Sequence, residues 1–396
     1  MDFDFTEEQL LLRDSVDKFL DKTYAFDARH AIIATRAGYS PDIWNGFAEL
    51  GLLGVPVPQT RDGFGGGGVE TMLVMESFGR HLVVEPYLGT VVMAAGLIAT
   101  VGSEDQQQYL LPLIMDGSMR LACGFLEPGG RYDLAHIETT ARQEANGFWV
   151  LNGSKSVVIH GAVADLLVIS ARTSGKAGDA DGISLFFVNP GEPGVAGREY
   201  PTYDGMRAAE VTFENVQINS ESLIGIVGRG LPVVELVADR AIAALCAEAV
   251  GCMTALKDAT LDYLKTRQQF GVPIGRFQAL QHRMVDLLMH CEQARSMAML
   301  AAMKVDSPDA VERRRAVSAA KELIGRSGRF VAQQAIQLHG GMGMTNELNV
   351  SHYVKRVTAI DTLFGDADHH LDRFTAAAGA LPLPSFEKPR SKWKQI

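Results

Sequence analysis

The chain has 396 residues, which at about 100–200 residues per domain corresponds to two to four domains with room for a sizeable core. Hydrophobic residues make up 47% and charged residues 21%, so a folded globular protein is expected and extensive disorder is excluded. The net charge of −10 disfavours nucleic acid as a partner, and no apolar run reaches the ~20 residues that cross a bilayer. The first residues, Met1 to Asp4, are acidic and lack an apolar signal core, so we expect a cytoplasmic protein.

Helical patterns fill the first third of the chain, which we assign to an N-terminal helical domain at residues 1–120. Thr6 and Gln9 form a capping-box pattern, and the apolar spacing that follows predicts a helix from Thr6 to about Asp21. Ser40-Pro41 supplies an N-cap and a first-turn proline for a second helix. Gly51 suits the left-handed conformation that ends such a helix.

From about residue 120 the apolar period changes from near 3.6 to 2, which predicts a small β domain at residues 121–228. Asn152-Gly153 lies between two apolar runs, 148–151 and 156–159. Because Asn-Gly readily takes positive φ at both centres of a type I′ turn, we expect a β-hairpin here. Further strands are predicted at residues 166–170, 183–188 and 211–213.

Helical periodicity returns after Gly230 and predicts a C-terminal four-helix bundle at residues 229–380. One long pattern begins at Ser307-Pro308 and runs toward Gly340. Residues 381–396 contain three prolines and four basic residues without an apolar period, and we interpret them as a tail. The predicted fold class is therefore α+β, with a helical domain on either side of a β domain.

Three glycine-rich or charged runs are candidates for phosphate, metal or cofactor binding. Residues 63–68 lack both a preceding strand and a following Lys-Ser/Thr, so a surface turn is favoured over a phosphate loop. Residues 366–370 contain two Asp and two His, but neighbours on a helix point to different faces, so a solvated helix start is favoured and no metal site is predicted. His339 to Gly343 is either a glycine helix cap or a place where backbone approaches a phosphate or cofactor closely.

Several strings together resemble the acyl-CoA dehydrogenase family. Residues 267–275, RQQFGVPIG, followed by Gln278 and Gln281, are similar to that family's RxxFGxPI…Q signature, and 337–343 to its QxxGGxG. Residues 126–129 resemble its TEP stretch and 152–155 its NGxK segment. The order of helical, β and helical regions is also that of the family. Finer strings at 364–371 and 281–283 resemble the small subunits of pimeloyl-CoA dehydrogenases.

The resemblance implies a function and a cofactor. In the family a carboxylate removes the α-proton of an acyl-CoA thioester while the β-hydrogen leaves as hydride to flavin N5. It thus implies FAD, an acyl-CoA substrate and an electron-transfer flavoprotein as acceptor. It further implies that six residues reach across a subunit interface to the adenosine and diphosphate half of a neighbour's FAD: Arg267, Phe270, Gln278, Gln337, Gly340 and Gly341.

The sequence departs from the family where the chemistry takes place. The usual catalytic glutamate falls on Phe364, whose phenyl ring cannot accept a proton. A second base position known in the family falls near Ala241, with Asp239 two residues upstream as a weak candidate. Positions expected to contact the flavin ring by stacking or hydrogen bonds carry only aliphatic side chains: Leu126, Val157 and Ile159.

Three hypotheses follow from this pattern. The first is a base-lacking subunit of an α2β2 acyl-CoA dehydrogenase, in which a paralogous large subunit holds most of the FAD. The second is a self-sufficient homotetrameric acyl-CoA dehydrogenase that uses Asp239 or another carboxylate. The third is a non-catalytic assembly subunit without FAD. The acyl group stays open between a long dicarboxylate, a steroid side chain and a branched acid.

Overall fold

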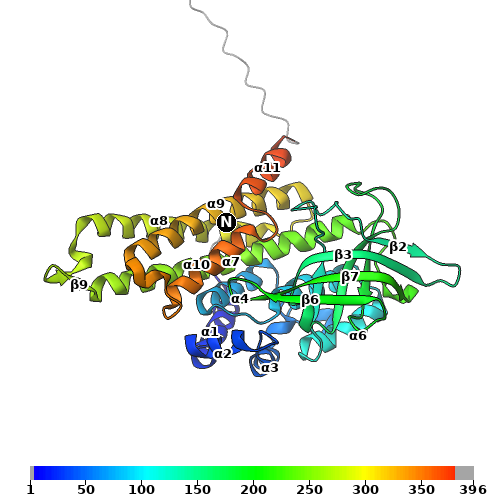
Figure 1. Ribbon diagram of the computed structural model, residues 1–396, viewed down its shortest axis with the longest axis horizontal. Helices are drawn as coiled ribbons and strands as arrows, with labels where there is room; N and C mark the ends of the chain where they lie inside the picture. The colour runs from blue at the N-terminus through cyan, green and yellow to red at the C-terminus, as the bar shows by residue number, and fades with distance from the viewer. Residues whose placement is uncertain (1–3, 380–396) are drawn as a thin grey trace, which may run out of the picture.

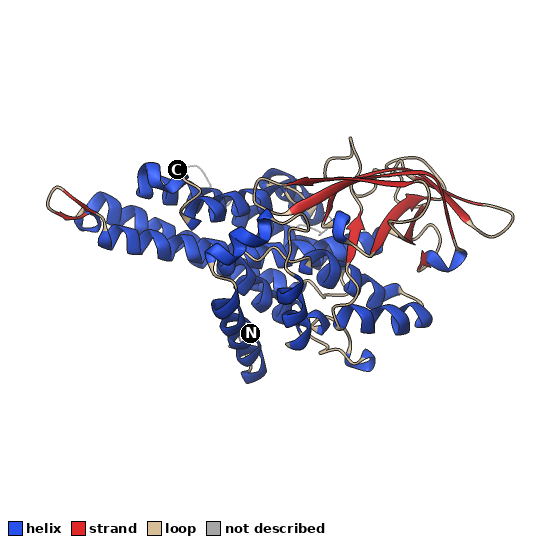
Figure 2. Cartoon of the chain, turned by 60° about the horizontal axis from the view of Figure 1, so that its bottom comes forward, coloured by secondary structure: helices blue, strands red, loops and turns tan. Residues whose placement is uncertain are grey.

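Two helical regions flank a β-sheet along the chain in the computed structural model, which describes residues 4–379 (Figure 1). The C-terminal helices run side by side as an arm that extends away from the sheet (Figures 1 and 2). The far end of the arm is the short hairpin of β9 (Gln268–Gln269) and β10 (Val272–Pro273). This architecture confirms the predicted α+β fold.

The N-terminal region begins with the two helices expected from their caps. In α1 (Glu7–Thr23) the Thr6 side chain accepts from the Gln9 amide and the Gln9 side chain accepts from the Thr6 amide, so the capping box is present. Ser40 caps α3 (Pro41–Glu49), and Gly51 follows it with a φ of 72°. The remaining helices of this region are α2 (Phe26–Ala34), α4 (Gly68–His81), the π-helical segment Leu88–Ala95, α5 (Gly96–Val101) and α6 (Glu104–Met115).

The glycine-rich run 63–68 leads into α4, and carboxylates already satisfy its last amides. The Gly67 amide donates to Glu70 Oε2 at 2.8 Å, and the Gly68 amide donates to Asp306 Oδ2 at 2.9 Å. Two acidic groups beside these N–H donors disfavour a phosphate at the same place.

The β domain is one eight-stranded sheet with the order β6-β7-β3-β2-β4-β5-β8, in which β1 pairs with β4 in parallel. Its long central pair, β3 (Trp149–Ile159) and β7 (Arg207–Ile218), is antiparallel. The other strands are β1 (Leu121–Gly124), β2 (Thr140–Gln143), β4 (Leu166–Arg172), β5 (Ile183–Val188), β6 (Val195–Pro201) and β8 (Leu223–Ile224).

The prediction of a hairpin turn at Asn152-Gly153 is wrong. These residues lie inside β3, which continues to Ile159, and the register with β7 shifts between Leu151 and Gly153 as in a β-bulge. A Cβ at Gly153 would lie 2.5 Å from Thr139 Oγ1, so only glycine fits. The turn lies instead at Asn146-Gly147, where β2 folds back onto β3 and Gly147 has a φ of 88°.

Up to residue 379, the C-terminal region contains five α-helices, and the longest is α7 (Leu231–Thr266) with 36 residues. Helix α9 (Ala310–His339) begins two residues later than expected, because Asp309 rather than Ser307 caps it by accepting from the Val311 amide at 2.8 Å. The predicted tail lies outside the described residues. Across residues 4–379, no helix combines the length and the apolar character needed to cross a membrane. The other three helices are α8 (Gln278–Lys304), α10 (Asn349–Thr362) and α11 (Ala367–Ala378).

A buried ion cluster joins the three regions. Arg356 on α10 donates to Glu248 of α7 at 2.5 and 2.8 Å and to Asp204, in the loop before β7, at 2.7 Å. Arg29 of α2 donates to the Asp204 carbonyl at 2.9 Å. Burial alone would lower the pKa of the Arg356 guanidinium, but Glu248 and Asp204 raise it above its ordinary value. One guanidinium thus ties the sheet to two helices of the arm.

His160 makes a second contact between regions, at the end of β3. Its Nε2 lies 2.8 Å from the Val84 carbonyl oxygen, so Nε2 carries a proton and donates. Burial, together with the nearby Arg356 charge, lowers the pKa of His160 to about 4. His160 is therefore neutral in the folded protein at pH 5, whereas an unfolded chain would protonate it below its ordinary pKa of about 6.5.

This difference predicts acid sensitivity. As the pH falls from 7.5 to 5, the unfolded state gains a proton at His160 that the folded state does not, so His160 alone should lower the free energy of unfolding by about 2 kcal/mol. His160→Asn removes the titrating group and keeps a residue that tolerates the φ of 56°. Urea unfolding at both pH values should show a loss smaller by about 2 kcal/mol in the variant. An equal loss in both proteins would contradict the assignment.

Candidate functional site

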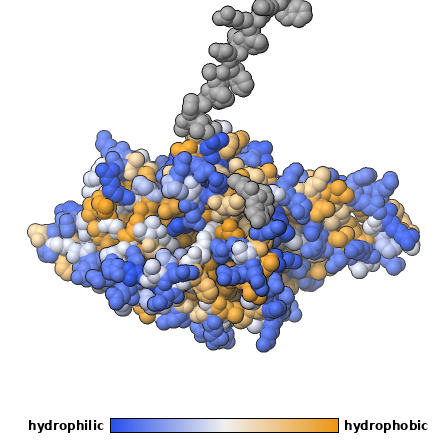
Figure 3. All heavy atoms as spheres, turned by 180° about the vertical axis from the view of Figure 1, so that it is seen from behind, coloured by the Kyte–Doolittle hydropathy of each residue, from blue (hydrophilic) through white to orange (hydrophobic). Residues whose placement is uncertain are grey.

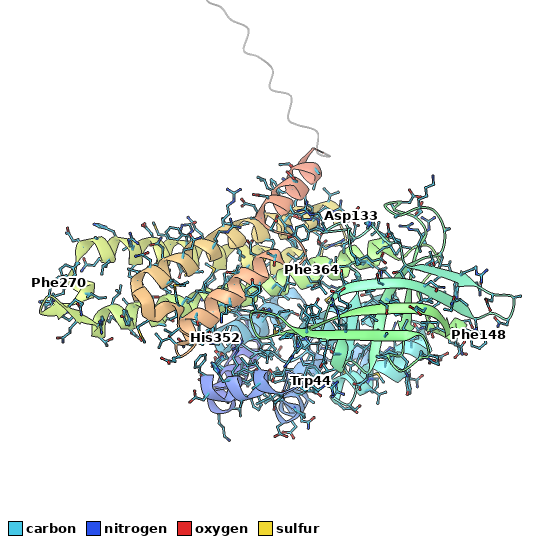
Figure 4. All side chains as sticks on the ribbon, in the orientation of Figure 1. Trp44, Asp133, Phe148, Phe270, His352 and Phe364 are labelled. Carbon is cyan, nitrogen blue, oxygen red and sulfur yellow. The ribbon has the colours of Figure 1, made fainter. Side chains whose placement is uncertain are left out.

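Two cavities meet at the turn between α10 and α11, where Phe364 lies beside the β domain (Figure 4). The outer cavity has a volume of about 630 Å³ and is formed by the loop 130–135, the first turns of α7, and α11. The inner cavity has a volume of about 30 Å³. Phe364 and Leu126 line both cavities and form the wall between them.

The inner cavity is apolar. Among the described residues that line it, none carries a carboxylate, and burial raises the pKa of its one thiol, Cys123. Three positions that the family resemblance placed around a flavin ring, Leu126, Val157 and Ile159, do gather here with Phe364. The cavity has room for about one water molecule. The side chains named here as its lining include no base that could accept an α-proton. Besides those four, its side chains are Leu88, Met93, Cys123, Phe125 and Ser156.

The outer cavity carries mixed charge. Glu235 of α7 pairs with Arg314 at 3.0 Å, and Asp366, the N-cap of α11, accepts from the His369 amide at 2.9 Å. Burial and the Asp366 carboxylate raise the pKa of Tyr132. Within residues 4–379, no group of three or more His, Cys, Asp and Glu side chains is placed to hold a metal ion.

Asp239, the weak base candidate, lies outside the linings of both cavities as residues 4–379 form them. Its side chain is 1% exposed, and its two oxygens accept from Arg313 at 2.9 Å and from Arg373 at 2.6 Å. Both carboxylate oxygens, with which a base would accept a proton, are therefore hydrogen-bonded to guanidinium groups. Ala241, at the family's second base position, is buried in the core.

The six residues expected to face a neighbouring chain lie at the far end of the arm. Figure 4 shows Phe270 there, well away from Phe364. Tyr263 near the end of α7 stacks on His339 at the end of α9, with 4.5 Å between ring centroids, and this contact brings the two signature segments together. The set consists of Arg267, Phe270, Gln278, Gln337, Gly340 and Gly341, and each is exposed.

The residues at this end of the arm suit the adenosine and diphosphate half of FAD. Phe270 is 91% exposed, and Arg267, the C-cap of α7, is exposed as well and carries a rigid guanidinium fork. A Cβ at Gly340 or Gly341 would meet nothing within 4 Å, so a ligand could approach the backbone closely. The inner cavity, by contrast, does not fit a flavin ring. The residues at this end of the arm thus suit the outer half of FAD, whereas those around the inner cavity do not suit its ring.

Two side chains near Phe364 were missed in the sequence. His370 was assigned to a solvated helix start, but it is 0% exposed. Lys321 of α9 is also 0% exposed and donates to the backbone carbonyls of Asp361, at the end of α10, and of Gly365, next to Phe364. A lysine inside the apolar stripe of a long helix was the available signal for Lys321.

Comparisons with known proteins agree with this geometry. Family models for the N-terminal, middle and C-terminal domains of acyl-CoA dehydrogenases match residues 6–118, 122–216 and 228–378. The chain is 30% identical to the mitochondrial isovaleryl-CoA dehydrogenase of Solanum tuberosum over 89% of its length and 85% of that protein. It is 28% identical to a probable acyl-CoA dehydrogenase, YngJ, of Bacillus subtilis over 96% of its length and 100% of that protein.

Solved structures give the same result. A chain of the ChsE4-ChsE5 complex from Mycobacterium tuberculosis matches with a TM-score of 0.87 and 25% identity, over 97% of this chain and 100% of that one. A chain of PigA in its FAD complex matches with a TM-score of 0.88 and 25% identity, over 96% and 99%. The chain belongs to the acyl-CoA dehydrogenase family, whose reaction is the FAD-dependent dehydrogenation of acyl-CoA thioesters and whose members bind FAD.

Proposed function

We propose that this chain is the base-lacking subunit of a mixed acyl-CoA dehydrogenase, in which it completes the flavin site of a paralogous catalytic chain. The observation that carries the proposal is the contrast between two places in one molecule. The inner cavity has Phe364 where the family has its glutamate, while Arg267 and Gly341 at the end of the arm keep the family pattern. Relatives that are complexes of two chains, such as ChsE4-ChsE5, support this reading.

The proposal extends to partners. It gives the complex an acyl-CoA substrate and an electron-transfer flavoprotein as acceptor, and it assigns the chain the part of a small subunit like those of pimeloyl-CoA dehydrogenases, acting in the cytoplasm. Helix α8 supports assembly, because Val285, Leu288 and Met289 on it are 54%, 44% and 51% exposed. Figure 3 shows hydrophobic residues breaking the hydrophilic surface of the arm. A mixed tetramer would bury such residues.

The direct test is flavin content. The chain is expressed alone and together with a candidate partner, a paralogous acyl-CoA dehydrogenase chain that keeps the glutamate, and the visible flavin absorbance of each purified product is measured. We expect bound flavin in the co-expressed complex and none in the chain alone. A yellow, flavin-saturated chain in the absence of any partner would refute the proposal.

A second candidate, the self-sufficient homotetramer, has one observation in its favour. Besides Glu235, three carboxylates line the outer cavity, and Asp366 lies only two residues beyond Phe364. The third candidate, an assembly subunit without FAD, predicts that changing Arg267 leaves the flavin content of the complex unaltered.

Activity separates the first two candidates. We expect the isolated chain to have no acyl-CoA dehydrogenase turnover with an artificial electron acceptor, because none of the described residues that line the inner cavity carries a carboxylate. Phe364→Glu alone should not restore normal rates, since Val157 and Ile159 still line the ring position and leave it without hydrogen bonds. Robust turnover by the isolated wild-type chain would favour the homotetramer instead.

A further inference from the structure

Phe364 has a backbone conformation that is unfavourable for a phenylalanine. Its φ is 57°, and the φ of the next residue, Gly365, is 114°. A left-handed conformation costs a non-glycine residue about 1–2 kcal/mol, and it persists only where the surroundings enforce it. The turn must therefore be held by its neighbours.

Two fully buried side chains hold it. Lys321 Nζ donates to the carbonyl oxygen of Asp361 at 2.9 Å and to that of Gly365 at 2.6 Å. His370 Nε2 lies 3.1 Å from the Phe364 carbonyl oxygen, and its Nδ1 lies 3.3 Å from Ser318 Oγ. Burial lowers the pKa of His370 to about 2, so the ring is neutral, with Nε2 as donor and Nδ1 as acceptor. Two carbonyls of the turn, those of Phe364 and Gly365, and one at the end of α10, that of Asp361, thus accept from buried side chains.

Burying an ammonium group is costly, and here the acceptors are backbone carbonyls rather than a carboxylate. Burial accordingly lowers the pKa of Lys321. The adjoining residues add a steric lock, because a Cβ at Gly365 would lie 2.4 Å from the His369 ring and 2.9 Å from the His370 ring. These buried hydrogen bonds and steric restrictions fix the backbone of the turn and therefore the position of the Phe364 ring.

We propose that Phe364 is a plug, clamped by Lys321 and His370, that keeps planar ring ligands out of the inner cavity of this chain. Among the described residues, Phe364 and Leu126 are the two that line both cavities. The outer one, at about 630 Å³, is within the range that organic ligands occupy, whereas the inner one, at about 30 Å³, holds no more than a water molecule. This goes beyond the proposed function, which requires only the loss of a base: the space itself is closed.

The plug is tested on the full-length chain alone with riboflavin as the probe, since riboflavin has the flavin ring but no adenosine or diphosphate. Phe364→Gly removes the ring and suits the positive φ. Riboflavin, followed by the quenching of its fluorescence, should bind this variant at least tenfold more tightly than the wild type. Phe148→Ala, which truncates a phenylalanine far from the cavities (Figure 4), should leave the wild-type affinity unchanged. Phe364→Ala replaces Phe364→Gly if the latter does not fold.

Two outcomes overturn the plug: folded Phe364→Gly or Phe364→Ala binds riboflavin no better than the wild type, or the wild type itself binds it at one equivalent.

The clamp is tested by hydrogen exchange. Lys321→Met should speed exchange of the amides at residues 363–366 at least tenfold, while Lys265→Met, at an exposed lysine, should not. His370→Asn serves if Lys321→Met does not fold. Unchanged exchange would reject the clamp. No partner chain is used, so these results are independent of the flavin content of the complex.

Discussion

Arg356→Met is expected to lower the free energy of unfolding by about 3–5 kcal/mol, the range seen when one partner of a buried ion pair is removed. The variant keeps an apolar side chain of similar length but leaves Glu248 and Asp204 without their cation. Glu248 and Asp204 are 2% and 3% exposed, so water cannot replace the lost donors. Although burial alone would raise the pKa of Asp204, Arg356 holds it below its ordinary value, which shows that the carboxylate depends on this contact.

The measurement is urea unfolding at a fixed protein concentration, because assembly would otherwise shift the apparent stability. Arg326→Met is the matched control. Arg326 pairs with Glu322 four residues away on the surface of α9, and its side chain is 56% exposed, so its loss should cost about 0.5 kcal/mol or less. Adding Glu248→Gln to Arg356→Met should recover part of the loss by removing one unpaired charge. Equal destabilisation by Arg326→Met and Arg356→Met would show that the cluster does not hold the regions together.

Local chemistry predicted the fold wherever a few neighbouring residues decide the structure. The Thr6 capping box and the Gly51 helix end are of this kind, and both are confirmed. The misplaced hairpin shows the limit. Two Asn-Gly pairs lie six residues apart, and Asn146-Gly147 forms the turn while Asn152-Gly153 does not, because β7 pairs along β3 and extends it through Asn152-Gly153. The residues next to Asn152-Gly153 in the sequence do not show that β3 pairs with the distant strand β7.

The candidate site divides in the same way. Leu126, Val157 and Phe364, which the family resemblance assigns to one site, line one cavity in the structure. The surroundings of Asp239 could not be foreseen. Its arginine partners are 74 and 134 residues away along the chain, and a carboxylate near a base position looks the same in sequence whether it is free or paired.

The second large effect concerns the cofactor, and it rests on the proposed function. Arg267→Ala is expected to weaken FAD retention in the co-expressed complex by about tenfold or more, which is the effect of losing one charge-assisted hydrogen bond of about 1.5–3 kcal/mol. The guanidinium offers several donors in a rigid fork, and its place beside the hairpin β9–β10 is fixed by the Ile274 amide, which donates to the Arg267 carbonyl at 2.9 Å.

The same change should hardly affect the folded chain. Arg267 is exposed at the end of α7, so the free energy of unfolding of the chain alone should move by no more than about 0.5 kcal/mol. Flavin released per complex after gel filtration measures the first effect and urea unfolding the second. Arg276→Ala, an exposed arginine of the same tip outside the family pattern, is the control and should keep its flavin. If the Arg267→Ala complex retains as much FAD as the Arg276→Ala complex, then the tip does not reach the cofactor, and the intact pattern of Phe270, Gln337 and Gly341 would have to be explained by subunit contacts alone.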